Sequence, residues 1–86
     1  MIALYHFKDG TSDKIWGWTK TEDGALSFWG RTRGSLSFKH YTSVWLAGDQ
    51  AYKKQRKGYR LVKDMDLMPE DWKGQFMIAK LGQTKF

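Results

Sequence analysis

The 86-residue chain contains no cysteine, which excludes disulfide bonds and thiolate metal sites and is compatible with a cytoplasmic location. No basic N-terminal segment precedes a long apolar run, so we expect neither a signal peptide nor a membrane span. Internal repeats, low-complexity runs and linkers are also missing. A chain of this length is typical of one domain. We therefore expect a single small cytoplasmic domain.

Side chains suited to catalysis are scarce. The two histidines do not have metal-ligand spacing, and no serine lies in a nucleophile-elbow motif. His6 and His40 lie in strand-like runs beside apolar residues, which favours half-buried structural roles. Glu70 and Asp71 directly follow Pro69, where they fit the first turn of a helix better than an acid–base pair. We therefore expect no enzyme activity, no metal site and no cofactor.

Aromatic and basic residues are abundant instead. Five Trp, four Tyr and five Phe exceed what a small core needs, so some of them should lie at the surface. The net charge of +6 is uneven, because residues 1–63 carry twelve Lys or Arg against five acids. Residues 64–86 carry three against four. A polyanion would be attracted to the first part, as would an anionic membrane, so charge alone does not choose between them.

The alternation of apolar and polar residues predicts an antiparallel sheet. Four extended runs, over residues 2–8, 14–20, 25–31 and 35–41, are separated by short polar turns that contain glycine. Such short spacing is typical of a meander, and residues 59–63 could add a short fifth strand.

Between the fourth and fifth strands the period becomes helical. Thr42 or Ser43 is a natural N-cap, and Gly58 is suited to end the helix after a run of cations. Four residues between them recur at helical spacing: Val44, Ala47, Ala51 and Gln55. One main helix on one face of an antiparallel sheet of four to five strands is an α+β architecture.

The last part of the chain is less regular. We expect a short helix over residues 69–73 and an extended segment over residues 75–81, because Gly74 interrupts the helical pattern. Residues 64–86 would then be an extension packed on a domain of residues 1–63. Its large apolar side chains would cover the sheet or form a self-association patch: Trp72, Phe76, Ile78 and Leu81.

Two groups of cations predict a surface that binds phosphate. One group lies at the end of the predicted helix and the other around the third turn, and we assign both to nucleic-acid binding: Lys53, Lys54, Arg56 and Lys57, with Arg31, Arg33 and Lys39. Cations at the end of a helix also interact favourably with its dipole, so the first group alone would be ambiguous.

Trp29 differs from the other tryptophans. It lies on the strand face opposite Leu26 and Phe28, and Gly30 and Arg31 follow it. We assign Trp29, Gly30 and Arg31 to the binding surface, because an exposed aromatic ring can stack on a sugar or base. The remaining tryptophans are predicted to be buried or half-buried: Trp16, Trp18, Trp45 and Trp72.

An ordered set of motifs resembles the WGR domain, which is named for a Trp-Gly-Arg motif. These motifs are Ser12-Asp13-Lys14-Ile15-Trp16, Trp29-Gly30-Arg31, the strand Leu36 to Tyr41 that carries Lys39, and Lys57-Gly58-Tyr59. The resemblance covers roughly residues 3–60. The turn Thr32-Arg33-Gly34 is shorter and more basic than the Gly-x-x-Gly turn of many family members.

The resemblance implies a fold and a function. WGR domains occur in poly(ADP-ribose) polymerases and in bacterial proteins, and they consist of a twisted antiparallel sheet with one helix. In the polymerases the motif Trp packs on a terminal nucleotide sugar at a DNA strand break, and the motif Arg contributes to DNA and interdomain contacts. The resemblance implies the same roles for Trp29 and Arg31.

We therefore predict a non-catalytic module that binds DNA, at ends or nicks, through backbone contacts and aromatic stacking. No helix-turn-helix or zinc-finger pattern is present to identify bases. One alternative is a protein-interaction module that docks through Trp29 and Arg31, since interfaces also favour Trp and Arg. A third is single-stranded nucleic acid or RNA on the sheet face. We expect a monomer or weak dimer.

Overall fold

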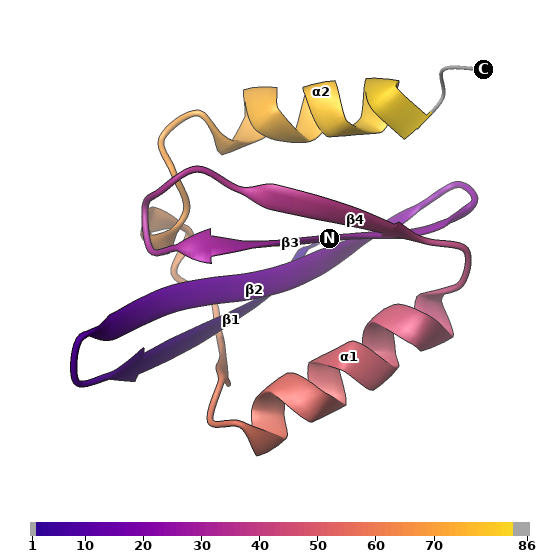
Figure 1. The fold of residues 1–86 in the computed structure, drawn as a ribbon. Helices are drawn as coiled ribbons and strands as arrows, with labels where there is room; N and C mark the ends of the chain where they lie inside the picture. The colour runs from indigo at the N-terminus through magenta and orange to yellow at the C-terminus, as the bar shows by residue number, and fades with distance from the viewer. Residues whose placement is uncertain (1, 84–86) are drawn as a thin grey trace.

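A five-stranded antiparallel sheet forms the centre of the computed structural model, which describes residues 2–83 (Figure 1). Two-residue turns join the first three strands, and a longer turn leads to the fourth, so these strands form a meander. The fifth strand pairs with the other edge of the first, which gives the order β4-β3-β2-β1-β5. The elements are β1 Ile2–Asp9, β2 Ser12–Thr21, β3 Gly24–Arg31, β4 Ser37–Tyr41, α1 Val44–Arg56, β5 Arg60–Val62, the 3-10 turn η1 Met65–Leu67, and α2 Trp72–Gln83.

The helix α1 covers one face of the sheet. Ser43 caps its start, where the side-chain oxygen accepts a hydrogen bond from the Trp45 backbone N–H. Ala47 and Ala51 are buried, and small side chains here allow the helix to approach the sheet closely. On this face Ala51 packs with three aromatic residues from the sheet side: Tyr5, Trp16 and Tyr59.

The second helix, α2, lies on the opposite side of the sheet (Figure 1). The larger apolar cluster is on this side and consists of Leu4, Ile15, Phe28, Met68 and Phe76. Met68 follows η1, and Phe76 comes from α2, so residues after Lys63 complete the core of the same sheet. The Phe76 ring contacts those of Phe28, Phe38 and Trp72, with centroids 4.9, 5.5 and 5.3 Å away.

These features confirm the predicted α+β fold: a small antiparallel sheet with one main helix on one face and a short second helix. Of the two N-cap candidates, Thr42 and Ser43, the structure has Ser43, and the fifth strand is present as Arg60–Val62. The fourth strand begins at Ser37, later than predicted, because the preceding Leu36 donates its backbone N–H to the Gln75 side chain of α2.

The prediction for the end of the chain is wrong. A continuous helix, α2, replaces the predicted helix over residues 69–73 and extended segment over residues 75–81. Trp72 and Phe76 are four residues apart, so a helix brings both side chains to the face that meets the sheet. Gly74 does not interrupt the helix, and a side chain at this position would meet open space. The helix therefore loses no packing there, only the roughly 1 kcal/mol that glycine costs relative to alanine.

The prediction for Trp45 is also wrong. This side chain is 83% exposed, whereas Trp16 is buried and Trp18 and Trp72 are half-buried. Trp45 precedes the buried Ala47 by two residues, and two residues correspond to about 200° around an α-helix. The ring therefore lies on the outer side of α1, away from the sheet.

Candidate nucleic-acid interface

Trp29 lies near the C-terminal end of β3. In the strand register it is opposite Trp16 of β2 and Ser37 of β4, so the three side chains share the face that α1 covers. Trp16 is only 3% exposed, whereas Trp29 is 38% exposed. The row of aromatic rings that starts with Tyr5 and Trp16 beneath α1 therefore ends in a ring that solvent can reach.

Cations flank Trp29 on the same face. Arg31 follows two residues later and is directly opposite Lys14 of β2. Lys39 of β4 is opposite Ser27, which precedes Trp29 by two residues. Because cross-strand partners project to the same side of a sheet, Lys14, Arg31 and Lys39 lie on the same sheet face as Trp29. All three cations are exposed.

The end of α1 brings further cations towards this group through a Schellman motif. The Gly58 N–H donates to the Gln55 carbonyl at 3.0 Å and the Tyr59 N–H to the Lys54 carbonyl at 3.1 Å. Gly58 has φ +110°, which the motif requires and which disfavours other residues. The motif returns Tyr59 beneath the last turn, where the Lys54 Nζ lies 5.3 Å from the Tyr59 ring centroid.

Two ammonium groups share one pair of aromatic rings on the same side of the sheet. The Phe7 and Tyr59 ring centroids are 5.3 Å apart, and the Lys14 Nζ lies 5.3 Å from the Phe7 centroid. Lys54 is placed in the same way over Tyr59. Lys14 of β2 and Lys54 of α1 therefore lie over the same pair of aromatic rings. We call Trp29 and the cations on this side of the sheet the basic–aromatic surface: Trp29, Lys14, Arg31, Lys39, Lys54 and Lys57.

Like charges meet within this surface. Burial lowers the pKa of the Lys54 ammonium below its ordinary value, and the positive charges of Lys57 and Lys14 lower that pKa further. The charged form of Lys54 is therefore held at a cost in the free protein. A bound anion would reduce this cost, because it would offset both the desolvation and the repulsion.

The structure does not bring every predicted cation to this surface. Arg56 is two residues from Lys54, about 200° around the helix, and its guanidinium donates to the Tyr52 hydroxyl at 3.4 Å. Lys53 is on the same side as Lys57 but forms an ion pair of 3.5 Å with Asp49. Of the cations at the end of α1, Lys54 thus interacts with Lys14, while all four line a separate depression at the end of the helix: Lys53, Lys54, Arg56 and Lys57.

Arg33 and Gly30 both take part in backbone contacts within the chain. Arg33 adopts φ +64°, and its backbone N–H donates to the Leu67 carbonyl at 2.8 Å, which joins this turn to η1. Its side chain lines a depression with Lys14 and Arg31 at the end of the sheet. A Cβ at Gly30 would lie 2.4 Å from the Ser35 carbonyl oxygen, so this glycine lets the chain's own backbone approach.

Asp13 connects three elements at the edge of the same depression. Its Oδ1 accepts a hydrogen bond of 2.6 Å from the Thr32 hydroxyl and lies 2.6 Å from His6 Nε2. The Thr32 backbone N–H also donates to the Asp13 carbonyl at 3.0 Å. The Thr32 and His6 hydrogen bonds lower the pKa of the Asp13 carboxyl. Asp13 is therefore ionised at neutral pH and fixes the turn that carries Arg31 and Arg33.

The second histidine has a different environment. His40 is half-buried on β4, where Nε2 lies 3.4 Å from Asp23 Oδ1 at the β2–β3 turn. Its Nδ1 is buried and has no hydrogen-bond partner among the described residues. Both histidines thus take part in contacts that hold strands and turns together.

Lys14 and Tyr59 were not predicted as site residues. Lys14 belongs to the Ser12–Trp16 motif and Tyr59 to the Lys57–Tyr59 motif, but neither motif indicates which residues are neighbours in space. The signal for Lys14 is the hairpin register, which places it opposite Arg31. The signal for Tyr59 is its position directly after Gly58, since the residue after a helix-ending glycine often packs on the last turn.

Comparisons with known proteins concern the fold. No family model matches this chain, and no curated protein matches it. The chain is similar to the crystal structure of a protein from Bacteroides fragilis, with a TM-score of 0.66 and 22% sequence identity. The match covers 78% of this chain and 21% of that protein, so this chain spans about a fifth of its length. At this identity the likeness supports the α+β fold and nothing further.

The described residues were also compared with the requirements for crossing a membrane. Between residues 2 and 83, neither helix is long and apolar enough to span a bilayer.

Proposed function

We propose that this chain is a non-catalytic module that binds DNA through its basic–aromatic surface. The observation that supports this most directly is that cations from β2, β3, β4 and α1 lie on the same side of the sheet as one exposed tryptophan. Lys14, Arg31 and Lys54 would contact phosphates, while the Trp29 ring would stack on a sugar or base.

The shape of this surface favours contacts with the nucleic-acid backbone over identification of bases. Its cations lie on a sheet face and beside the end of α1, and none lies on a helix that protrudes to enter a groove. Guanidinium and ammonium groups on such a surface neutralise phosphates without regard to sequence. We therefore propose binding with little sequence preference. The roles that the WGR resemblance implies for Trp29 and Arg31 agree with this proposal and stay predictions.

A salt titration tests the proposal. We would measure the affinity of the full chain for labelled nicked, blunt-ended and single-stranded DNA at several salt concentrations. About five phosphate contacts predict a log–log slope of roughly −4 to −5. The double variant K14A/R31A should bind more weakly and reduce the slope by about 2, because each lost phosphate contact removes about 0.9. Lys8→Ala is the matched control, since Lys8 pairs with Asp13 on the other face of the sheet.

Three results would count against the proposal. Absence of binding at low salt by the folded protein would contradict it directly. Unchanged affinity in K14A/R31A would show that this surface is not the binding site. A nearly flat salt dependence, with a protein partner that Trp29→Ala releases, would favour the alternative of a protein-interaction module.

A further inference from the structure

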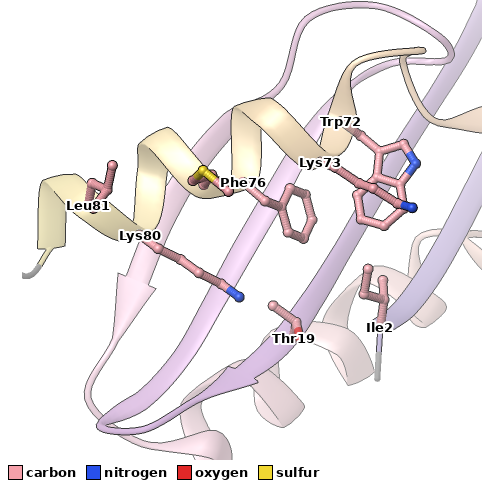
Figure 2. A pocket seen from close by; sticks show the side chains of 8 residues that line it. Ile2, Thr19, Trp72, Lys73, Phe76, Lys80 and Leu81 are labelled. Atoms are coloured by element: carbon pink, nitrogen blue, oxygen red, sulfur yellow. The ribbon is translucent and has the colours of Figure 1, made fainter.

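A second surface lies on the opposite side of the molecule, between α2 and the sheet. It is a groove of about 460 Å³, and we call it the α2 groove. Figure 2 shows that Trp72, Phe76 and Lys80 project from α2 towards Ile2 and Thr19 of the sheet. Trp72 and Phe76 form its apolar floor, and Phe76 is also part of the core.

The apolar surface continues from the α2 groove onto the outside of α2. Met77, Ile78 and Leu81 are 65%, 72% and 64% exposed. Together with Gly74 they have the spacing i, i+3, i+4, i+7, which places them in one stripe along the helix. A side chain at Gly74 would meet nothing within 4 Å, so a partner could approach the backbone closely at this end of the stripe. Such a stripe fits the apolar side of a second helix.

The charged residues that line the α2 groove are both lysines, whereas the exposed acids Glu70 and Asp71 precede the stripe at the start of α2. Lys73 and Lys80 are two helical turns apart on the same flank of α2, and both line the α2 groove. The Lys73 Nζ lies 5.6 Å from the Trp72 ring centroid, so this charge is held at the edge of the apolar floor. Among the described residues that line the groove, none is acidic.

This charge pattern disfavours an antiparallel second copy of the chain as the occupant. In a two-fold antiparallel pair of α2 helices, the same flanks meet, which brings Lys73 of one helix towards Lys80 of the other. Like charges would then lie together beside an apolar contact, where water screens them less. A parallel second copy would place each lysine flank beside the opposite flank of its partner, and the test of oligomeric state below distinguishes it.

We propose that the α2 groove and the adjoining stripe bind an amphipathic helix of a partner protein, with apolar residues along one side and carboxylates along one flank. The apolar side would cover Met77, Ile78 and Leu81, and the carboxylates would pair with Lys73 and Lys80. This surface and the basic–aromatic surface lie on opposite faces of the sheet. The protein could therefore hold an acidic protein partner and a nucleic acid at the same time.

A designed peptide tests this proposal independently of DNA binding. The probe is a labelled helical peptide with leucine at i, i+3, i+4 and i+7 and glutamate along one flank. Its control has lysine in place of each glutamate. Fluorescence polarisation with the full chain should show that the glutamate peptide binds at least tenfold more tightly. Met77→Ser/Ile78→Ser and Lys73→Glu/Lys80→Glu should each weaken its binding about tenfold. Lys20→Glu should not, because Lys20 neighbours Thr19 but projects to the other face.

The outcomes separate this proposal from its competitors. Amide chemical-shift changes confined to residues 72–81 and neighbouring sheet residues would support it. Equal binding of both peptides, or no binding at about millimolar protein, would overturn it. A concentration-dependent dimer that Met77→Ser/Ile78→Ser abolishes would also overturn it, because a second copy would then cover the stripe. Lys14→Glu should leave peptide binding unchanged while it weakens DNA binding, so the two proposals can fail separately.

Discussion

The position of Trp29 could be predicted from the sequence, whereas the exposure of Trp45 could not. The alternation in β3 places Trp29 opposite the buried Leu26 and Phe28, and two-residue periodicity is sufficient to predict which face it occupies. Trp45 lies in a helix that buries only small side chains, Ala47 and Ala51, so the general tendency of tryptophan to be buried gave the wrong expectation.

Trp29→Ala should reduce DNA affinity about tenfold, since stacking contributes ~1–3 kcal/mol per base. It should lower the melting temperature much less than Trp16→Ala, because truncating a buried Trp costs roughly 3–5 kcal/mol. Trp45→Ala is the matched control and should change neither quantity. Calorimetry measures the melting temperature, and a DNA titration measures the affinity. A large loss of stability in Trp29→Ala would instead identify this ring as part of the core.

Asp13 predicts a pH dependence of stability. Because hydrogen bonds lower the pKa of its carboxyl in the folded protein, its stabilising contribution is present above the ordinary pKa of 3.8. That contribution is lost as the pH falls through the lower folded value. Asp13→Asn should therefore lower the melting temperature near neutral pH, and the difference from wild type should shrink below about pH 4. Thermal melts between about pH 2 and 7 measure this, and a constant difference would contradict it.

Among the elements, the strands and α1 were largely predictable, whereas α2 was not. Turn residues and alternation define each strand locally, and Ser43 and Gly58 mark the two ends of α1. The pairing of Lys14 with Arg31 could not be predicted, since alternation gives faces within a strand but not the register between strands. α2 depends on contacts of Phe76 with Phe28 and Phe38, which are distant in sequence.

Two glycine-to-alanine substitutions should change the stability of the protein in opposite directions, because an added Cβ would clash in β3 but not in α1. Gly30→Ala should destabilise the protein by more than 1 kcal/mol, since the new Cβ would lie 2.4 Å from the Ser35 carbonyl oxygen. Gly48→Ala should stabilise it by roughly 0.5–1 kcal/mol, because this position in α1 meets nothing within 4 Å. Urea denaturation measures both. Stability unchanged in Gly30→Ala, combined with lost DNA binding, would assign Gly30 to the interface instead.

At the scale of the whole molecule, one sheet carries two different surfaces. The face towards α1 combines buried aromatic rings with cations, and the face towards α2 holds the larger apolar cluster. Each helix thus covers one face of the sheet, and the residues after Lys63 complete the core on the α2 side. This division follows from the two-residue period of the strands, which sends neighbouring side chains to opposite sides.

A chain that ends at residue 63 should fail to fold cooperatively. It would lose the buried Met68 and Phe76 and expose Phe28 and Phe38 to water. The loss of one buried Phe costs roughly 3–5 kcal/mol, a large part of the ~5–15 kcal/mol by which small proteins are stable. Circular dichroism melts and amide chemical-shift dispersion measure this. A sharp melting transition in the shortened chain would show that residues 1–63 are a domain on their own.

The place of β5 has a consequence for how the chain folds during synthesis. β1 forms hydrogen bonds with β2 as soon as the first hairpin has emerged, but its other edge pairs through contacts such as Leu4 with Val62. Local hairpins form quickly, whereas pairs distant in sequence close late. The outer edge of β1 stays unpaired until β5 has been made, and an exposed edge attracts other chains. A chain interrupted before residue 60 should therefore aggregate more readily than the full chain.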